Sequence, residues 1–462
     1  MRKTKLPQKQ GLNIIIVGCG KVGSTLVEQL IKEGHDITII DKNAEKIQAL
    51  TNAYDLMGIV GNGASYSVQK EAGIENTNLL ISVTDSDELN LLCCTIAKQV
   101  ANCDAIARVR TPDYSREVGY LREKLGLAMI INPELEAARE VARILYLPTA
   151  LEVNTFAHGE AELIKFKIPK GNVLHNMSVS ELGRKNPDTI LICAIERDEK
   201  LHIPSGDFIL QEDDLISFVA PRKMAKRFLE HIGFKTHQVK DTMIIGGGKA
   251  AFYLAERLLS MGIAVKIIEQ DRKRCEELSL LLPKAVIING DGTYEDLLKE
   301  EGIEYIESFV PLTGIDEENI LLTLFARQVS SAKVVTKINR ITFKDVISNL
   351  DLGSVIYPRY ITSEAIVAYV RAKKDSMHSN IETLYHMFDN RAEAIEFLVD
   401  ADCEIVDIPL MDLSLKKGLL VCFIHRNGRI IIPSGQDCIK AGDTVMVVTT
   451  HTGFNDIQDI LQ

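Results

Sequence analysis

Two glycine-rich stretches of the chain combine residue types and spacings that suit phosphate binding. "GLNIIIVGCGKVGSTLVEQL" (11–30) and "TMIIGGGKAAFYLAERLL" (242–259) each join a β-branched run, a glycine turn and an amphipathic pattern. A strand, a tight turn and a helix are the parts of a dinucleotide-binding loop, whose backbone N–H groups and helix N-terminus bind a pyrophosphate. The sequence therefore predicts two phosphate-binding loops.

The first loop has the complete glycine pattern. Gly18 permits the tight turn, Gly20 lets a phosphate approach the backbone, and Gly23 lets the helix pack close to the sheet. Asp41 ends the next predicted strand, where a carboxylate accepts hydrogen bonds from a ribose diol and repels a 2′-phosphate. These residues favour an NAD- or adenosine-type ligand over NADP. The alternative is a doubly wound fold whose glycines serve only packing.

The second loop departs from this pattern at one position. Gly246 and Gly248 are present, Ala251 stands in the place of the third glycine, and Glu269 ends the following strand pattern, "VKIIE". Alanine still permits helix–strand packing, and glutamate can accept hydrogen bonds from the same diol. A second site is therefore predicted, with a weak or empty site as the alternative.

Further polar residues follow predicted strands at matching places in the two halves. Asn62 corresponds to Asp291, Thr84-Asp85 to Thr313-Gly314, and Arg108 to Lys337. Open α/β sheets bind ligands at the carboxyl ends of their strands, and a cation there can reach a phosphate. Lys21 and Lys249 directly follow the glycines and are predicted to contribute backbone N–H groups. For each residue, the alternative is a residue that only shapes a loop or carries a solvated charge.

These motifs recur because the chain is a tandem repeat. At a displacement of 229 residues, "GNGASYSVQKEAGI" (61–74) matches "GDGTYEDLLKEEGI" (290–303), "VTDSDELNLL" (83–92) matches "LTGIDEENIL" (312–321), and "IPSGD" (203–207) matches "IPSGQ" (432–436). Each copy splits again, since strand patterns that alternate with helical patterns give way to closely spaced short strands. A mainly helical connector is predicted at 371–390.

The predicted fold class is α/β, with two Rossmann-like doubly wound parallel sheets, each followed by a small β-rich α+β domain. The predicted domains are 11–147 and 238–374, which bind nucleotide, and 148–232 and 375–462, which are small. The strand candidates of the first domain are "NIIIVG", "DITIID", "LMGIVG", "LLISVT", "AIARVR" and "AMIIN".

Composition excludes several classes of protein. The 462 residues carry a net charge of −11, which argues against nucleic acid as a partner. The longest apolar runs are strand-sized, and the basic start, "MRKTKLPQKQ", lacks the apolar core of a signal peptide, so a cytosolic location is expected. The nine cysteines form no CxxC pair, which predicts reduced core residues and no metal site.

Catalytic signatures are missing from the sequence. Tyr120 and Lys124 have the YxxxK spacing of short-chain dehydrogenases, but no serine lies about a dozen residues upstream. The sequence contains no HExxH, GxxxxGK[ST] or GxSxG string. A non-enzymatic nucleotide-binding protein is therefore expected. The alternative is an NAD-dependent oxidoreductase with one degenerate Rossmann copy.

The motif order "GCGKVG", "ITIID", "GNGAS", "VTDSDELN" and "IARVRTPDY", followed by a small domain with "IPSGD", resembles the TrkA family of tandem RCK-domain proteins from about residue 11 to residue 460. The resemblance implies a regulatory subunit of a potassium uptake transporter, which binds NAD(H), with ATP or ADP as further ligands. It also implies a homo-oligomeric ring, a tetramer, which gates a membrane-embedded Trk subunit from the inner face of the cell membrane. A nucleotide sensor serving a different partner is a further alternative.

The resemblance also implies a set of ligand-binding residues. In the first copy these are Gly18, Cys19, Gly20, Lys21, Val22, Asp41, Asn62, Thr84, Asp85 and Arg108. In the second copy they are Gly246, Gly247, Gly248, Lys249, Ala250, Glu269, Asp291, Thr313 and Lys337. The sequence departs from the pattern at Ala251 and Gly314, which concerns the ligand choice of the second site.

Overall fold

The computed structural model describes residues 11–185, 190–234, 236–339, 347, 350–374, 380–388 and 390–462. The basic N-terminal segment, 1–10, lies outside these ranges. The chain divides into two compact units, Met1–Glu136 with Tyr357–Val367 and Ala137–Ile356 with Ala368–Gln462. One parallel sheet lies in the former unit, and three further sheets lie in the latter. The boundaries predicted for four domains stay predictions.

The first parallel sheet has apolar central strands that are buried on both faces, and its edge strand Met57–Val60 is largely exposed. Its strands are β1 (Asn13–Val17), β2 (Asp36–Asp41), β3 (Met57–Val60), β4 (Leu79–Ser82), β5 (Asp104–Arg108) and β6 (Met129–Ile131). Their order in the sheet is β3-β2-β1-β4-β5-β6, and every pair is parallel. This order confirms the doubly wound sheet, and its topological switch point lies between β1 and β4.

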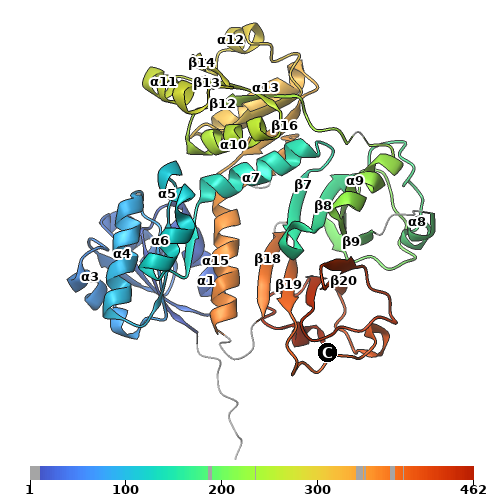
Figure 1. Cartoon of the computed structure of the whole chain (residues 1–462), viewed down its shortest axis with the longest axis horizontal. Coiled ribbons are helices and arrows are strands. Elements are labelled where there is room, and N and C mark those ends of the chain that lie inside the picture. The colour runs from blue at the N-terminus through green and yellow to red at the C-terminus, as the bar shows by residue number, and fades with distance from the viewer. Residues whose placement is uncertain are drawn as a thin grey trace, which may run out of the picture. The chain divides into compact units, whose positions relative to one another are not determined.

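Among the described residues up to Tyr146, the chain forms seven helices and a 3₁₀ turn, and side chains cap some of these helices. They are α1 (Lys21–Lys32), α2 (Ala44–Ala53), α3 (Tyr66–Glu71), α4 (Asp87–Val100), α5 (Pro112–Arg116), α6 (Val118–Leu125) and α7 (Pro133–Tyr146), with a 3₁₀ turn at Ile74–Asn76. Asn43 Oδ1 accepts a hydrogen bond from the Glu45 N–H at 2.9 Å at the start of α2. Ser86 Oγ accepts one from the Leu89 N–H at 3.1 Å at the start of α4. Figure 1 shows α3 and α4 beside the first sheet, in blue.

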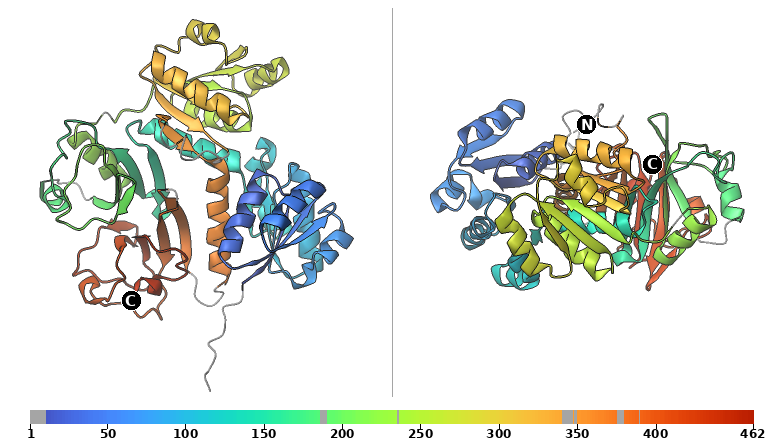
Figure 2. Two further views of the ribbon diagram at one scale, coloured as in Figure 1. Left: turned by 180° about the vertical axis from the view of Figure 1, so that it is seen from behind. Right: turned by 90° about the horizontal axis from the view of Figure 1, so that it is seen from above.

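The second parallel sheet repeats this plan. Its strands are β12 (Asp241–Ile245), β13 (Ala264–Glu269), β14 (Val286–Asn289), β15 (Ser308–Pro311), β16 (Lys333–Lys337) and β17 (Ser354–Ile356), in the order β14-β13-β12-β15-β16-β17. Its helices are α10 (Lys249–Ser260), α11 (Arg272–Leu281), α12 (Glu295–Glu300) and α13 (Asp316–Val329), and α15 (Pro358–Lys374) follows. In Figure 2, the gold helix α13 lies over strands β15 and β16, which it contacts.

Each small domain is an antiparallel sheet of five strands. The first has β7 (Glu152–Phe156), β8 (Ala161–Lys167), β9 (Leu191–Arg197), β10 (Lys200–His202) and β11 (Leu215–Pro221), with α8 (Val179–Lys185), α9 (Arg222–His231) and a 3₁₀ turn at Ala157–Gly159. The second has β18 (Ile381–Met387), β19 (Ala392–Leu398), β20 (Leu419–Arg426), β21 (Arg429–Ile431) and β22 (Thr444–Thr449), with 3₁₀ turns at Leu410–Asp412 and Ile457–Ile460. The orders β7-β8-β11-β9-β10 and β18-β19-β22-β20-β21 are equivalent, as the repeat requires.

The two small sheets pack against each other through a shared core. Phe156, Leu163, Cys193 and Val219 of the first sheet meet Phe388, Cys422, Phe423 and Met446 of the second. The Ala157 N–H donates to Glu396 Oε1 at 2.7 Å, and Arg391 forms an ion pair with Glu196. Figure 1 shows β7 and β8 in teal beside β18 and β19 in orange. The two copies of the small domain therefore form one internal pair.

The predicted helical connector at 371–390 is wrong in its second half. α15 ends at Lys374, and Ile381–Met387 form strand β18. This segment, "IETLYHM", contains good helix formers, but it pairs antiparallel with β19 and buries Ile381 and Met387. Pairing with a neighbouring strand overrides the local helix propensity. Residues 375–379 and 389 lie outside the described ranges.

Candidate nucleotide sites

The first glycine loop makes a tight turn between β1 and α1. Gly18 has φ +101°, which favours glycine, and its N–H donates to the Ile40 carbonyl at 2.8 Å. A Cβ on Gly18 would lie 2.9 Å from the Thr84 backbone nitrogen, so the loops after β1 and β4 touch at the switch point. A Cβ on Gly23 would lie 1.9 Å from the Gly18 carbonyl oxygen, so α1 starts directly against the loop.

Gly20 is the N-cap of α1 and faces open space. A Cβ there would meet no heavy atom within 4 Å, and no side chain caps the helix at this end. The first-turn N–H groups of a helix have no intrahelical partner, and the helix dipole adds partial positive charge there. Lys21 and Val22 are the first two residues of α1, and Lys21 is exposed whereas Val22 is buried. This end of α1 is therefore shaped to receive an anion.

Asp41, at the end of β2, is fixed by the loop. Its Oδ2 accepts a hydrogen bond from the Cys19 N–H at 2.6 Å, and its Oδ1 accepts one from the Asn43 N–H at 2.8 Å. An ionised carboxylate has about four lone-pair positions, so these two bonds leave acceptors for the hydroxyls of a ribose. We call this arrangement the carboxylate clamp. The acid at the end of β2 and the glycine loop are therefore in direct contact, and the role of Asp41 toward a ribose stays a prediction.

The other first-copy residues also lie at the carboxyl ends of strands. Asn62 follows β3, and its Oδ1 accepts from the Ala64 N–H at 3.2 Å. Thr84 and Asp85 follow β4, and Arg108 ends β5. Arg108 is buried, with Nη2 bonded to the Thr84 carbonyl and 3.3 Å from Asp85 Oδ1, while the Asp85 side chain is fully exposed. The buried Arg108 side chain therefore stabilises the Thr84–Asp85 loop.

Asn90 is a structural residue that the sequence analysis missed. From α4, its Oδ1 accepts from the Thr84 N–H at 2.8 Å and from Ser82 Oγ at 3.0 Å. Its Nδ2 donates to the Thr84 carbonyl at 3.1 Å and to the Arg108 carbonyl at 2.9 Å. This fully buried amide joins the ends of β4 and β5. An asparagine inside the apolar face of a predicted helix was the available signal, in "DELNLL".

The second loop reproduces the carboxylate clamp. Gly246 has φ +93°, and the Gly247 N–H donates to Glu269 Oε2 at 2.6 Å. Glu269 Oε1 accepts from the Asp271 N–H at 2.7 Å. Gly248 is the N-cap of α10, and a Cβ there would meet nothing within 4 Å. Lys249 and Ala250 are the first residues of α10. The longer glutamate thus occupies the role of the aspartate without changing the hydrogen-bond pattern.

The remaining second-copy residues occupy equivalent places. Asp291 follows β14, and its Oδ1 accepts from the Thr293 N–H at 2.9 Å. Thr313 follows β15, and its N–H donates to Asn319 Oδ1 at 3.0 Å. Lys337 ends β16, and its Nζ donates to the Leu312 carbonyl at 3.1 Å. Gly314 offers no side chain where the first copy has Asp85, while Asp291 places an acid where the first copy has Asn62, so the acids at the two mouths lie at different positions.

Arg274, on α11, is a cation at the second loop that the sequence analysis also missed. Its Nε donates to the Gly247 carbonyl at 2.7 Å, and its Nη1 lies 2.9 Å from Glu277 Oε2. The equivalent residue of the first copy, from the alignment of the two loops, is the exposed Lys46. A planar guanidinium can hold a carbonyl and still offer donors to a phosphate. The signal in the sequence was a basic residue three positions after the helix cap.

Electrostatics at the first site favour binding over covalent chemistry. Burial, and then the nearby Asp41, raise the pKa of the Cys19 thiol to about 12, so it stays protonated near neutral pH. Burial and the neighbouring Arg110 lower the pKa of the Arg108 guanidinium, which nevertheless stays charged because arginine titrates so far above neutrality. Tyr120 lies on α6 and is 61% exposed. Within the described ranges, no cluster of His, Cys, Asp or Glu could hold a metal ion.

Both sites can therefore accept a ligand that combines a diol with a phosphate. The clamp supplies acceptors, the glycine N-caps leave space for a phosphate against the helix N-terminus, and a cation lies at the neighbouring strand end, the buried Arg108 in the first copy and the half-buried Lys337 in the second. These features come from the same positions in both copies. In the part of the chain that the structure describes, no helix is long and apolar enough to cross a membrane.

Comparisons with known proteins agree with this architecture. The TrkA-N domain model matches residues 14–133 and 242–358, and the TrkA-C domain model matches residues 163–233 and 394–462. The Trk system potassium uptake protein TrkA of Haemophilus influenzae is 32% identical over 443 residues, which cover 94% of this chain and 95% of that protein. The protein of the same name from Halomonas elongata is 30% identical over 458 residues, with 98% and 99% coverage.

Solved structures give the same fold. "Crystal Structure of the GsuK RCK domain" has a TM-score of 0.64 at 16% identity and covers 97% of this chain and 95% of that chain. "GsuK channel bound to NAD" has a TM-score of 0.63 at 17% identity and covers 96% of this chain and 78% of that chain. The domain matches and the relatives extend over nearly the whole length, so the chain belongs to the TrkA family of Trk system potassium uptake proteins.

Proposed function

We propose that the protein is the nucleotide-binding regulatory subunit of a potassium uptake system, and that ligand bound at its two glycine loops controls a membrane-embedded Trk subunit. The carboxylate clamp, made by Asp41 in one copy and Glu269 in the other, is the observation that carries the proposal. It supplies the diol acceptors of a dinucleotide site twice in one chain. The names of the relatives, Trk system potassium uptake protein TrkA, supply the transported ion.

NAD(H) is the proposed ligand of the first site, and ATP or ADP is a further ligand of the pair. The pyrophosphate binds at Gly18–Val22, the ribose at Asp41, and the remaining contacts come from Asn62, Thr84, Asp85 and Arg108. The second site uses Gly246–Ala250, Glu269, Asp291, Thr313 and Lys337 in the same roles. Structures with the same fold carry the titles "GsuK channel bound to NAD" and "Crystal structure of the GsuK bound to ADP", which supports both ligand classes.

The ligand acts as a signal, and no bond in it breaks. The Cys19 thiol is held protonated, and Tyr120 is exposed on α6, so neither supplies an acid or a nucleophile beside the loop. A ligand that favours one arrangement of the domains shifts their equilibrium by its differential affinity. We propose that this shift reaches the membrane subunit through a homo-tetrameric ring at the cytoplasmic face of the membrane.

Calorimetry tests the ligand assignment. NADH, NAD, ATP and ADP are titrated into the wild-type chain, Asp41→Ala, Glu269→Ala and the control Asp36→Ala, an exposed acid at the opposite end of β2. Losing two hydrogen bonds from the ribose is expected to weaken NADH at the first site about tenfold or more in Asp41→Ala, with no change in the control. Unchanged affinities in both clamp variants would overturn the assignment.

Activity assays separate the regulatory role from the alternative. Potassium flux through a Trk membrane subunit in proteoliposomes is expected to depend on the added chain and on nucleotide, and to lose its nucleotide response with Gly20→Asp. Carbonyl substrates incubated with NADH are expected to remain unreduced. Turnover would favour the oxidoreductase, and flux that ignores the chain would point to a different partner.

A further inference from the structure

A large pocket lies in the unit formed by Ala137–Ile356 and Ala368–Gln462. Its walls come from α7, from the β7–β8 hairpin and α9 of the first small domain, and from α10 of the second parallel-sheet domain. The pocket has a volume of about 1010 Å³, which is at the upper end of the range for small-molecule sites. Neither predicted site includes any residue of this lining.

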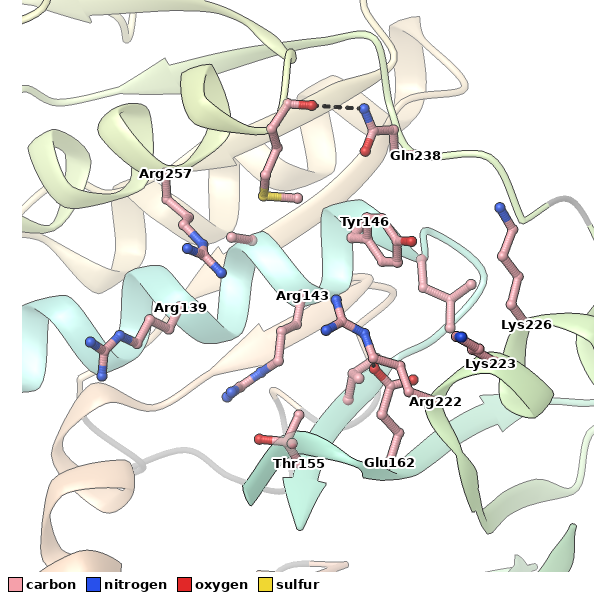
Figure 3. Close-up of a pocket in the computed structure, with 15 residues that line it drawn as sticks. Arg139, Arg143, Tyr146, Thr155, Glu162, Arg222, Lys223, Lys226, Gln238 and Arg257 are labelled. Carbon is pink, nitrogen blue, oxygen red and sulfur yellow. Dashed lines mark hydrogen bonds and ion pairs between the residues drawn. The ribbon is translucent and has the colours of Figure 1, made fainter. Parts of the chain in front are cut away.

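The lining is strongly cationic. Six positively charged side chains face a single carboxylate, that of Glu162, in a chain whose net charge is −11. The six are Arg139, Arg143, Arg222, Lys223, Lys226 and Arg257. Figure 3 shows Arg139 and Arg143 projecting from α7, Lys223 and Lys226 from α9, and Arg257 from α10. Like charges held this close repel one another, so an anion that neutralises them binds favourably.

Two observations show that this charge is not already neutralised within the pocket. Arg222 Nε lies 3.4 Å from Glu162 Oε1, so the single carboxylate already has a partner. Burial raises the pKa of Glu162, with Arg222 and then Arg143 acting against that shift. Among the described residues, the buried Nε of Arg143 has no hydrogen-bond partner. A buried arginine N–H without an acceptor is costly, and a bound anion would satisfy it. Arg139 already interacts with another group of the chain, so the charge available to an anion comes mainly from the other five cations.

One side of the pocket can receive a flat ring. The Tyr146 ring is exposed and lies 5.8 Å from the Arg222 guanidinium, and Val153, Leu147 and Met261 supply apolar surface nearby. Nucleotide-binding sites combine an aromatic ring with a cationic cluster, because the base stacks on the ring and the phosphates bind the cations. The chemistry of the lining therefore matches a ligand with both parts.

We propose that this pocket binds a small soluble polyanion with several phosphate groups, of the nucleoside polyphosphate class, at a third site separate from the two glycine loops. Its cations come from three segments: α7, α9 of the first small domain and α10. Because α10 begins at the second glycine loop, the ligand would tie the first small domain to the helix that carries that loop. Its occupancy is then coupled to nucleotide binding at the second loop, and the coupling is reciprocal.

Inorganic tripolyphosphate is the sharpest probe, since it has no ribose for the carboxylate clamps. Calorimetry on the full chain compares wild type with Lys223→Glu/Lys226→Glu, which reverses two exposed pocket cations. The matched control is Arg184→Glu/Lys185→Glu, which reverses two exposed cations on α8, outside the pocket lining. In the pocket variant, the affinity for tripolyphosphate is expected to fall at least tenfold, which corresponds to about 1.4 kcal/mol. In the control, it is expected to fall less than about threefold.

The same titration separates this site from the glycine loops. The double variant Gly20→Asp/Gly248→Asp is expected to change the affinity for tripolyphosphate by less than threefold. ATP is expected to lose its binding at the two loops and to keep its binding at the pocket. Absence of binding to the wild type, equal weakening in the α8 control, or weakening only in the loop variant would each overturn the proposal. If the pocket variant does not fold, Arg257→Gln and Lys226→Gln are used singly, each with an expected weakening of about threefold.

Anionic vesicles test the other source of phosphate. Phosphatidylserine vesicles are sedimented with the wild type and with Lys223→Glu/Lys226→Glu. Binding to vesicles that depends on these lysines, together with no affinity for tripolyphosphate or ATP at the pocket, would assign the cations to a lipid surface and overturn the small-molecule site. No binding to vesicles, together with tripolyphosphate binding that depends on these lysines, would support the small-molecule site.

Discussion

The two glycine loops share their hydrogen bonds with the acid and differ in how closely the loop after the fourth strand approaches them. In both, the acid after the second strand clamps the loop at 2.6 Å, through Cys19 N–H in one copy and Gly247 N–H in the other. A Cβ on Gly18 would lie 2.9 Å from the next loop, whereas one on Gly246 would lie 3.3 Å away. The second turn is looser, and there Ala251 is accommodated, fully buried. The clamp is therefore the shared requirement, and the third glycine is not.

The two mouths also differ in charge. Asp85 places an exposed carboxylate at the first mouth, where the second has Gly314, and Arg274 holds the Gly247 carbonyl of the second loop. A phosphate beyond the pyrophosphate meets an acid in the first copy and none at the same position in the second. At this one position we expect the second site to repel an additional phosphate less than the first does, whereas Asp291 adds an acid where the first copy has Asn62.

The largest expected effect comes from filling the tight turn. In Gly23→Ala the new Cβ would lie 1.9 Å from the Gly18 carbonyl oxygen, so α1 must move away from the loop. We expect a loss of stability of about 3 kcal/mol and NADH affinity at the first site reduced about 100-fold. Ala251→Gly, the converse change, is expected to cost about 1 kcal/mol or less in denaturant unfolding. Equal losses in the two variants would contradict the looser second turn.

Removal of the buried amide at the switch point should hurt the first copy more. Asn90→Ala strands the Thr84 N–H, the Arg108 carbonyl and the Ser82 hydroxyl. Asn319→Ala removes fewer hydrogen bonds, because Pro311 stands in the place of Ser82 and because Thr313 Oγ1 donates to the Ile315 carbonyl, whereas Thr84 Oγ1 donates to Asn90. Stranded buried groups cost about 1–3 kcal/mol each where water cannot reach them. We expect about 2 kcal/mol for Asn90→Ala and about 1 kcal/mol for Asn319→Ala, and the reverse order would break the comparison.

A half-buried lysine gives the second copy a pH dependence at one position of its sheet. Lys333 corresponds to Asp104, and its Nζ donates to the Ala150 carbonyl at 2.6 Å. Burial, with Arg327 nearby, lowers its pKa to about 7. Between about pH 7 and the pKa of an unfolded lysine, near 10.4, the unfolded chain binds the additional proton, so stability rises with pH. Below pH 7 both states are protonated and the penalty is constant.

The measurement is the unfolding free energy of the full chain from pH 7 to pH 10, in the wild type and in Lys333→Met. We expect the wild type to gain up to about 1.4 kcal/mol for each pH unit relative to the variant. Lys266→Met is the control, because that lysine is partly exposed and paired with Glu301 at 2.7 Å. Parallel curves for the wild type and Lys333→Met would show that the amine is not buried in solution.

The smallest effect concerns the charge at the two mouths. Asp85→Gly removes the first mouth's exposed acid, and we expect ATP to bind about threefold tighter there while NADH changes little. Gly314→Asp should weaken ATP at the second site by a similar factor. Isotherms recorded at low and high salt check the mechanism, because a Coulomb effect shrinks as salt rises. A salt-independent change would assign the difference to loop geometry instead.

The sequence predicted the parts of the molecule that local pattern and the repeat determine. Both parallel sheets, the glycine turns and the places of Asp41 and Glu269 at the ends of their strands follow from short-range rules on strand period, turn glycine and strand ends, whereas the hydrogen bonds of these acids to the loops were not predicted. The buried state of Cys93 and Cys94, on the inner face of α4, was also predictable from their apolar setting.

The parts that depend on long-range contacts escaped the sequence. Strand β18 exists because β19 pairs with it, and nothing within "IETLYHM" separates this from a helix. In the sequence, Arg274 cannot be distinguished from an ordinary surface charge, because the hydrogen bond from its Nε to the Gly247 carbonyl forms only in the folded chain. The cationic pocket gathers residues from 139 to 261, so no window of sequence shows it.

The internal pair of small domains bears on how such a chain can change over generations. When identical chains pair, a substitution alters both sides of their contact at once, and a compensating change must suit both. Here Ala157 meets Glu396, and Arg391 meets Glu196, with each partner encoded separately. One half of this contact can therefore vary while the other stays fixed. Tandem fusion frees the two halves from symmetry, and that freedom permits one loop to keep Gly23 at the third motif position while the other has Ala251 there.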